Sequence, residues 1–113
     1  MLTDLVIYQK CYDLVLYAYP IIAKYPRNAR FTLGQQTTDL VILIMRMIAR
    51  ANRERDKKKT LWEIDGSLEQ LRLLTRLAKD LKMLSVHQYG LMNERISEIG
   101  RLLGGWMKTC AGL

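Results

Sequence analysis

The sequence has little proline and cysteine, and it has no long uncharged apolar run. Both prolines, Pro20 and Pro26, lie in the first quarter, so residues 27–113 lack the residue that breaks helices most strongly. The two cysteines, Cys11 and Cys110, are too few for a disulfide framework, and we expect both to be reduced. The most apolar run, residues 40–48, contains Arg46, whereas a membrane span needs about 20 apolar residues. A membrane partner is therefore not expected, and because no secretory leader pattern is present we expect a cytoplasmic protein.

The composition is that of one basic globular domain. Half of the 113 residues are apolar, which is enough to form a packed interior and argues against disorder. The formal net charge is +7, with 18 Lys and Arg against 11 Asp and Glu. A single domain over residues 1–113 with an anionic partner is the first expectation.

Apolar residues recur at spacings of three and four along four segments, which predicts helices over residues 3–24, 29–55, 60–83 and 86–110. The four stripes are Leu5, Tyr8, Tyr12, Val15, Tyr19 and Ile22; Leu33, Thr37, Leu40, Ile44, Met47 and Ala51; Leu61, Ile64, Leu68, Leu71, Leu74, Ala78 and Leu81; and Val86, Tyr89, Met92, Ile96, Ile99, Leu103, Trp106 and Cys110. Short connections between long helices predict an all-α, antiparallel up-down-up-down four-helix bundle.

Three local signals refine the helices. Pro20 lies inside the first stripe, so we expect a kink near Leu16. Ser85 followed three residues later by Gln88 is a capping-box start for the last helix. Residues 56–59 contain neither Gly nor Pro, so the second and third helices could be continuous. We prefer a polar loop there, because a helix of about 55 residues lies far outside ordinary lengths.

The positive charge is concentrated in one part of the chain. Residues 27–60 hold nine basic and three acidic residues, giving +6, whereas residues 1–26 and 61–84 are each neutral. Arg46, Arg50, Arg53 and Lys57 are spaced four, three and four apart, which places them on one helical face opposite the apolar stripe. Such a face is typical of a protein with a polyanionic partner, although a solvated surface remains the simpler alternative.

Further basic residues extend the candidate surface. The candidate contacts for a nucleic acid or a protein partner are Arg27, Arg30, Arg46, Arg50, Arg53, Lys57, Lys58, Arg72, Arg76 and Lys79. The tyrosines lie on the apolar stripes rather than among these residues, and we expect those before Pro26 to pack against the last helix. No zinc-finger spacing or RNA-recognition motif is present, so base-specific recognition is not indicated.

The sequence offers little for catalysis. His87, the one histidine, lies in the first turn of the last predicted helix, and we interpret it as a surface residue. Glu94 and Glu98 lie one turn apart beside arginines, which is typical of ion pairs within a helix. Convergent metal ligands and an activated cysteine are also lacking. We expect no enzyme activity, no metal and no cofactor.

Glycines in the last helix need a separate explanation. Gly100 and Gly104 lie four residues apart, and each costs about 1 kcal/mol relative to alanine in a helix interior. Close packing within the bundle would explain them, and so would a subunit interface with Trp106 as its anchor.

Four stretches together carry a resemblance to a known family. They are residues 25–35 (YPRNARFTLGQ), 71–81 (LRLLTRLAKDL), 84–89 (LSxxQY) and 98–106 (EIGRLLGGW). In this order they resemble the accessory variability determinant (Avd) proteins of diversity-generating retroelements, and the resemblance covers almost the whole chain. One departure is the end of the sequence, where only Lys108 follows Trp106 as a charge, whereas some relatives have a more basic tail.

The resemblance implies a four-helix protomer that assembles into a basic homopentameric barrel. It implies a non-enzymatic accessory protein that binds a reverse transcriptase and the template RNA, or DNA or an RNA–DNA hybrid, to support mutagenic cDNA synthesis and retrohoming. The related ribosomal-RNA intervening-sequence proteins share the bundle. The alternative is therefore a stand-alone RNA-binding four-helix bundle of that type.

Overall fold

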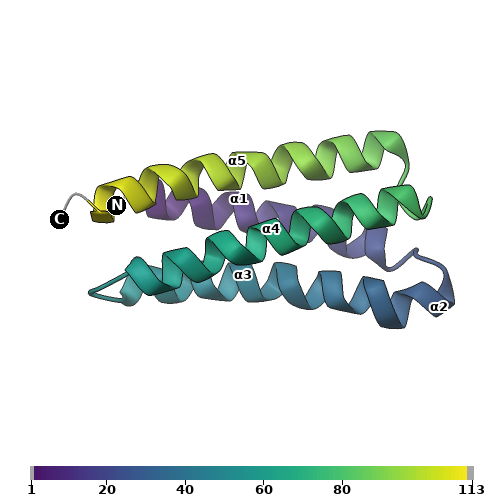
Figure 1. The fold of residues 1–113 in the computed structure, drawn as a ribbon, viewed down its shortest axis with the longest axis horizontal. Coiled ribbons are helices and arrows are strands. Elements are labelled where there is room, and N and C mark those ends of the chain that lie inside the picture. Colours follow the sequence, from purple (N-terminus) through teal and green to yellow (C-terminus); the bar gives the residue numbers. More distant parts are fainter. Residues whose placement is uncertain (1, 112–113) are drawn as a thin grey trace.

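The structure is a computed structural model that describes residues 2–111, with side chains described for residues 6–110. Over that range the chain is helical and contains no strand. The helices are α1 (Leu2–Ile22), α2 (Arg27–Ala29), the π-helix η1 (Arg30–Gly34), α3 (Gln35–Arg53), α4 (Lys58–Asp80) and α5 (Val86–Ala111). Because α2, η1 and α3 follow one another without a break, the chain forms four helical rods (Figure 1).

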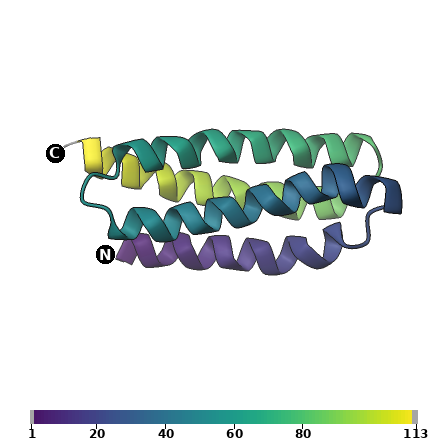
Figure 2. The same ribbon diagram turned by 90° about the horizontal axis from the view of Figure 1, so that it is seen from below.

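The four rods form an antiparallel bundle, which confirms the predicted all-α class. Each rod packs against the next one along the chain, and α1 also packs against α5, so that α1 and α4 lie on one diagonal (Figures 1 and 2). Both chain ends and the 54–57 connection lie at one end, which we call the termini end. The other end, which we call the turn end, carries α2, η1 and the 81–85 connection. The 54–57 connection is not helical, as the preferred loop required.

The buried residues confirm most of the second, third and fourth predicted stripes, but the first stripe was predicted wrongly. Along α1 the buried residues are Ile7, Cys11, Leu14, Ala18 and Ile22. Tyr12 and Tyr19, which the spacing placed in the core, are 44% and 58% exposed, so the prediction that they pack on the last helix was wrong. Apolar residues surround most of α1, and therefore more than one stripe satisfies the helical spacing. Leu5 of the predicted stripe lies outside the described side chains.

Smaller departures occur at the ends of the other stripes. Leu81 and Val86 are 54% and 81% exposed, because Leu81 is the first residue of the 81–85 connection and Val86 is the first residue of α5. Along α3 the predicted Ile44, Met47 and Ala51 are buried, at 0%, 5% and 0% exposure. The helical period therefore identifies the core where the opposite face is polar.

The start of the second rod differs from the uninterrupted α-helix that was predicted. Residues Arg30–Gly34 form a π-helix, in which successive residues Leu33 and Gly34 are both buried. A Cβ atom at Gly34 would lie 3.2 Å from Ile22 Cγ2 and 3.3 Å from Tyr25 Cδ2. The first rod thus approaches Gly34 closely where the second rod has the wider turn of a π-helix. Phe31 of the same π-helix lies on the surface and is 69% exposed.

The turn between α4 and α5 confirms the predicted capping box and corrects the predicted end of α4. Ser85 N donates to Gln88 Oε1 at 3.0 Å and Gln88 N donates to Ser85 Oγ at 3.0 Å, which confirms the capping box. Helix α4 ends at Asp80 rather than near Met83, because Lys82 adopts a left-handed conformation with φ 63°. Met83 N then donates to Ala78 O at 2.8 Å, as in a Schellman motif.

Candidate nucleic-acid interface

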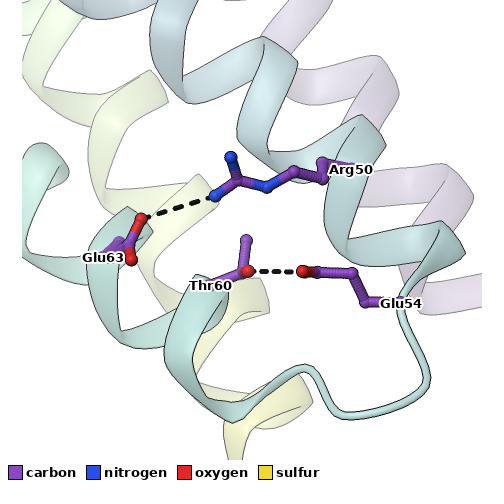
Figure 3. Close-up of polar contacts among 4 residues, drawn as sticks. All are labelled: Arg50, Glu54, Thr60 and Glu63. Atoms are coloured by element: carbon purple, nitrogen blue, oxygen red, sulfur yellow. Dashed lines mark hydrogen bonds and ion pairs between the residues drawn. The ribbon is translucent and has the colours of Figure 1, made fainter.

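The outer face of α3 presents the arginine stripe as predicted. Arg46, Arg50 and Arg53 are all exposed and lie on one side of the helix. Arg50 reaches across to α4, where its Nη2 lies 3.4 Å from Glu63 Oε2 (Figure 3). Among the described side chains, Arg46 and Arg53 form no ion pair, so these two guanidinium groups are available to a partner.

Lys57 does not belong to this stripe, and its predicted outward orientation was wrong. Its Nζ donates to Ala51 O at 2.8 Å and to Glu54 O at 2.5 Å. These carbonyls lie at the C-terminal end of α3, where a positive charge also interacts favourably with the helix dipole. Glu54 in turn accepts a hydrogen bond from the Thr60 hydroxyl across the loop (Figure 3). Lys57 therefore holds the 54–57 connection instead of facing solvent.

The basic residues of α4 lie beside α5, away from the arginine stripe of α3. Arg72 pairs with Glu69, Arg76 Nε lies 3.9 Å from Asp80 Oδ2, and Lys79 Nζ lies 3.5 Å from Asp80 Oδ1. The Lys79 ammonium also lies 4.6 Å from the centre of the Tyr89 ring of α5. Because each of these cations already has an intramolecular partner, this group is less available than Arg46 and Arg53.

Arg27 and Arg30 lie at the turn end, in α2 and η1, and both are exposed. The Arg30 guanidinium carbon lies 5.9 Å from the centre of the Phe31 ring, in the range of a cation–π contact. These eight predicted contacts are therefore distributed over three separate surfaces and do not form one patch.

Lys58 lies at the termini end beside residues that the sequence argument missed. Together with Lys59 and Trp62 of α4 and Met107, Lys108 and Cys110 of α5, it lines a hollow of about 600 Å³ whose floor also includes Leu61. Trp62 is 69% exposed. Lys58 and Lys59 precede Trp62 by four and three residues, which was a readable signal, whereas Lys108 lies 46 residues further along the chain and is brought there only by the fold.

Gly100, Gly104 and Trp106 of α5, the residues considered for a subunit interface, differ in their surroundings. Trp106 is only 4% exposed and belongs to the core of the protomer, which argues against its role as an interface anchor. A Cβ atom at Gly100 would lie 2.7 Å from Arg72 Nη2, so Gly100 leaves room for that guanidinium. At Gly104 a Cβ atom would meet none of the described atoms within 4 Å, and packing within the protomer does not explain this glycine.

No group of three or more His, Cys, Asp or Glu residues that could hold a metal ion occurs among the described residues. His87 is exposed, as expected. Burial raises the pKa of the Cys11 thiol to about 12 and that of the Tyr25 hydroxyl to about 12, which keeps both groups neutral. Of the described helices, none has the length and apolar character needed to cross a membrane.

Comparison with known proteins identifies a family. The model of the bAvd-like family matches residues 5–110, which is nearly the whole chain. None of the curated proteins matches the chain.

Proposed function

The chain belongs to the bAvd-like family of accessory proteins, and from this membership we propose that it serves a diversity-generating retroelement without being an enzyme. In this role it binds the reverse transcriptase and the template RNA, and it supports mutagenic cDNA synthesis and retrohoming. The family match agrees with the resemblance carried by residues 25–35, 71–81, 84–89 and 98–106.

The observation that carries the proposal is the outer face of α3. Arg46 and Arg53 are exposed there without an ion-pair partner among the described side chains, and Arg50 lies between them. Arginine binds phosphate and carboxylate groups through two parallel hydrogen bonds. A helix face of this kind suits RNA phosphates, and it equally suits an acidic surface of a reverse transcriptase.

The proposed assembly is a homopentamer, and two exposed apolar faces support a ring. Leu16 and Tyr19 of α1 are 59% and 58% exposed, and Leu73 and Leu77 of α4 are 67% and 46% exposed. A cyclic oligomer needs two different surfaces on each protomer, one for each neighbour. Since α1 and α4 lie on a diagonal of the bundle, their outer faces are two separate surfaces, as head-to-tail contacts require.

Co-purification and binding measurements test the proposal. Arg46→Gln combined with Arg53→Gln should abolish capture of the reverse transcriptase encoded beside this gene, and it should lower the salt dependence of RNA binding by about 1.4 in log–log slope. The control is Lys10→Gln with Arg101→Gln, which removes the same charge from α1 and α5. Equal capture by both double variants would contradict the assigned face.

Two further outcomes separate the alternatives. RNA binding without capture of any reverse transcriptase would favour a stand-alone RNA-binding bundle of the intervening-sequence type. Light scattering that gives a single chain of 13.2 kDa would contradict the pentamer.

A further inference from the structure

We infer that the hollow at the termini end is a stacking site for one unpaired base of single-stranded RNA. Trp62 is the platform for the base, and Lys58, Lys59 and Lys108 contact the flanking phosphates. The inference rests on the proposed function, because it specifies how the bundle holds one segment of its nucleic acid.

The floor of the hollow suits a flat aromatic ligand. Leu61, Trp62, Met107 and Cys110 supply an apolar surface, and the volume of about 600 Å³ is ample for one nucleotide. Trp62 is 69% exposed, although exposure of an indole to water is unfavourable. A base that stacks on the indole removes this apolar surface from water, and stacking tolerates any base because every base has a π-face.

Trp62 also differs from three other aromatic rings of the protein in its cationic contacts. Three other aromatic rings are covered by a cation of the protein: Arg30 lies over Phe31, Lys79 over Tyr89 and Arg95 over Tyr17. Among the described side chains, no lysine or arginine lies over the Trp62 ring, even though three lysines line the same hollow. The lysines therefore surround the platform and leave its face available for stacking.

The charge around the hollow favours RNA over an acidic peptide. Lys58, Lys59 and Lys108 form no ion pair with the described side chains, and no acidic residue occurs among the described residues of the lining. Phosphates satisfy this charge as carboxylates would. A nucleotide, however, joins its anionic group directly to a flat ring that can cover the apolar part of the lining between the lysines.

Binding of a labelled oligouridylate measures the contribution of the platform. Trp62→Leu keeps an apolar side chain but removes the indole, and it should weaken binding by about fivefold or more, which corresponds to about 1 kcal/mol. Trp62→Phe should retain most of the affinity. The matched control is Phe31→Leu, which removes the other aromatic ring that is 69% exposed, at the turn end, and should leave affinity unchanged.

The outcomes distinguish this inference from the proposed function. Wild-type binding that is unchanged in Trp62→Leu overturns the stacking site and leaves the proposed function standing. A wild-type protein that binds no RNA overturns RNA binding itself. Normal RNA binding by Trp62→Leu with loss of the reverse transcriptase, or with a smaller assembly in light scattering, places a protein surface in the hollow and also overturns the inference.

Discussion

The two ends of the bundle use the same residue types in different ways. Each end carries an aromatic ring that is 69% exposed, Trp62 at the termini end and Phe31 at the turn end, and each ring has basic neighbours. At the turn end Arg30 covers Phe31. At the termini end the lysines line a hollow around Trp62 without covering the ring.

A second contrast concerns the lysine that follows each helix. After α3 the side chain of Lys57 binds the last carbonyls, whereas after α4 the backbone of Lys82 turns in a left-handed conformation. The charge of Lys57 stabilises the end of α3, whereas the Cβ atom of Lys82 makes the left-handed turn after α4 less favourable. Net charge alone therefore does not distinguish a binding lysine from a structural one.

The largest expected difference is in thiol reactivity. Cys110 lines the hollow, whereas Cys11 is fully buried and its pKa is raised to about 12. At about pH 8 roughly one Cys11 thiol in 10,000 is ionised, and only the thiolate reacts. N-ethylmaleimide should therefore modify Cys110 more than a hundredfold faster, as followed by mass spectrometry.

The same reaction reports on occupancy of the hollow. Oligouridylate should slow modification of Cys110 and leave Cys11 unreactive. Modification of both cysteines at similar rates would contradict the buried position of Cys11, and an unchanged Cys110 rate with bound RNA would count against the termini end as a binding site.

The next effect compares the cations of the two ends. Lys58→Gln, Lys59→Gln and Lys108→Gln together remove three charges from the termini end, and Lys24→Gln, Arg27→Gln and Arg30→Gln remove three from the turn end. If the lysines contact three phosphates, the first set should lower the log–log salt slope of RNA binding by about 2. The second set should lower it by clearly less, because in the wild-type protein Arg30 covers the Phe31 ring and these cations therefore flank no uncovered platform. Equal slopes for the two sets would remove the distinction between the ends.

The sequence predicted all four rods, and it predicted the buried face of three of them because those rods have a polar face opposite the apolar one. It failed for α1, where the largely apolar rings of Tyr12 and Tyr19 occur at helical spacing beside the buried residues, so that the period is ambiguous. The π-helix depends on contacts of Gly34 with Ile22 and Tyr25, which belong to the preceding rod and its turn. Such a contact is a property of the packed bundle and leaves no periodic signal.

The candidate site was predictable only in part. The outward face of α3 follows from helical spacing, so Arg46, Arg50 and Arg53 were identified correctly as exposed. The role of Lys57 depends on the path of the loop, which turns its ammonium back onto the end of α3. The hollow combines Trp62 of α4 with Lys108 of α5, and spacing along one helix could not indicate that pairing.

The third prediction separates a structural lysine from a binding lysine within the termini end. Lys57→Met should lower the free energy of unfolding by about 1 to 2 kcal/mol, because a charged donor to two helix-end carbonyls is lost. Lys58→Met should leave stability unchanged, since the exposed Lys58 forms no ion pair with the described side chains. Urea unfolding measures both, and equal stability of the two variants would show that the Lys57 contacts contribute nothing.

The smallest effect tests the corresponding lysine of the turn end and has the opposite sign. Lys82 has φ 63°, a conformation that costs a residue with a Cβ atom roughly 1 kcal/mol and costs glycine nothing. Lys82→Gly should therefore raise the free energy of unfolding by up to about 1 kcal/mol, as measured by urea unfolding. Lys82→Ala is the matched control, because it removes the same charge and keeps the Cβ atom, and it should give no gain. A gain of equal size in both variants would mean that charge rather than backbone conformation limits stability at this turn, and the contrast between the two helix ends would then be one of charge alone.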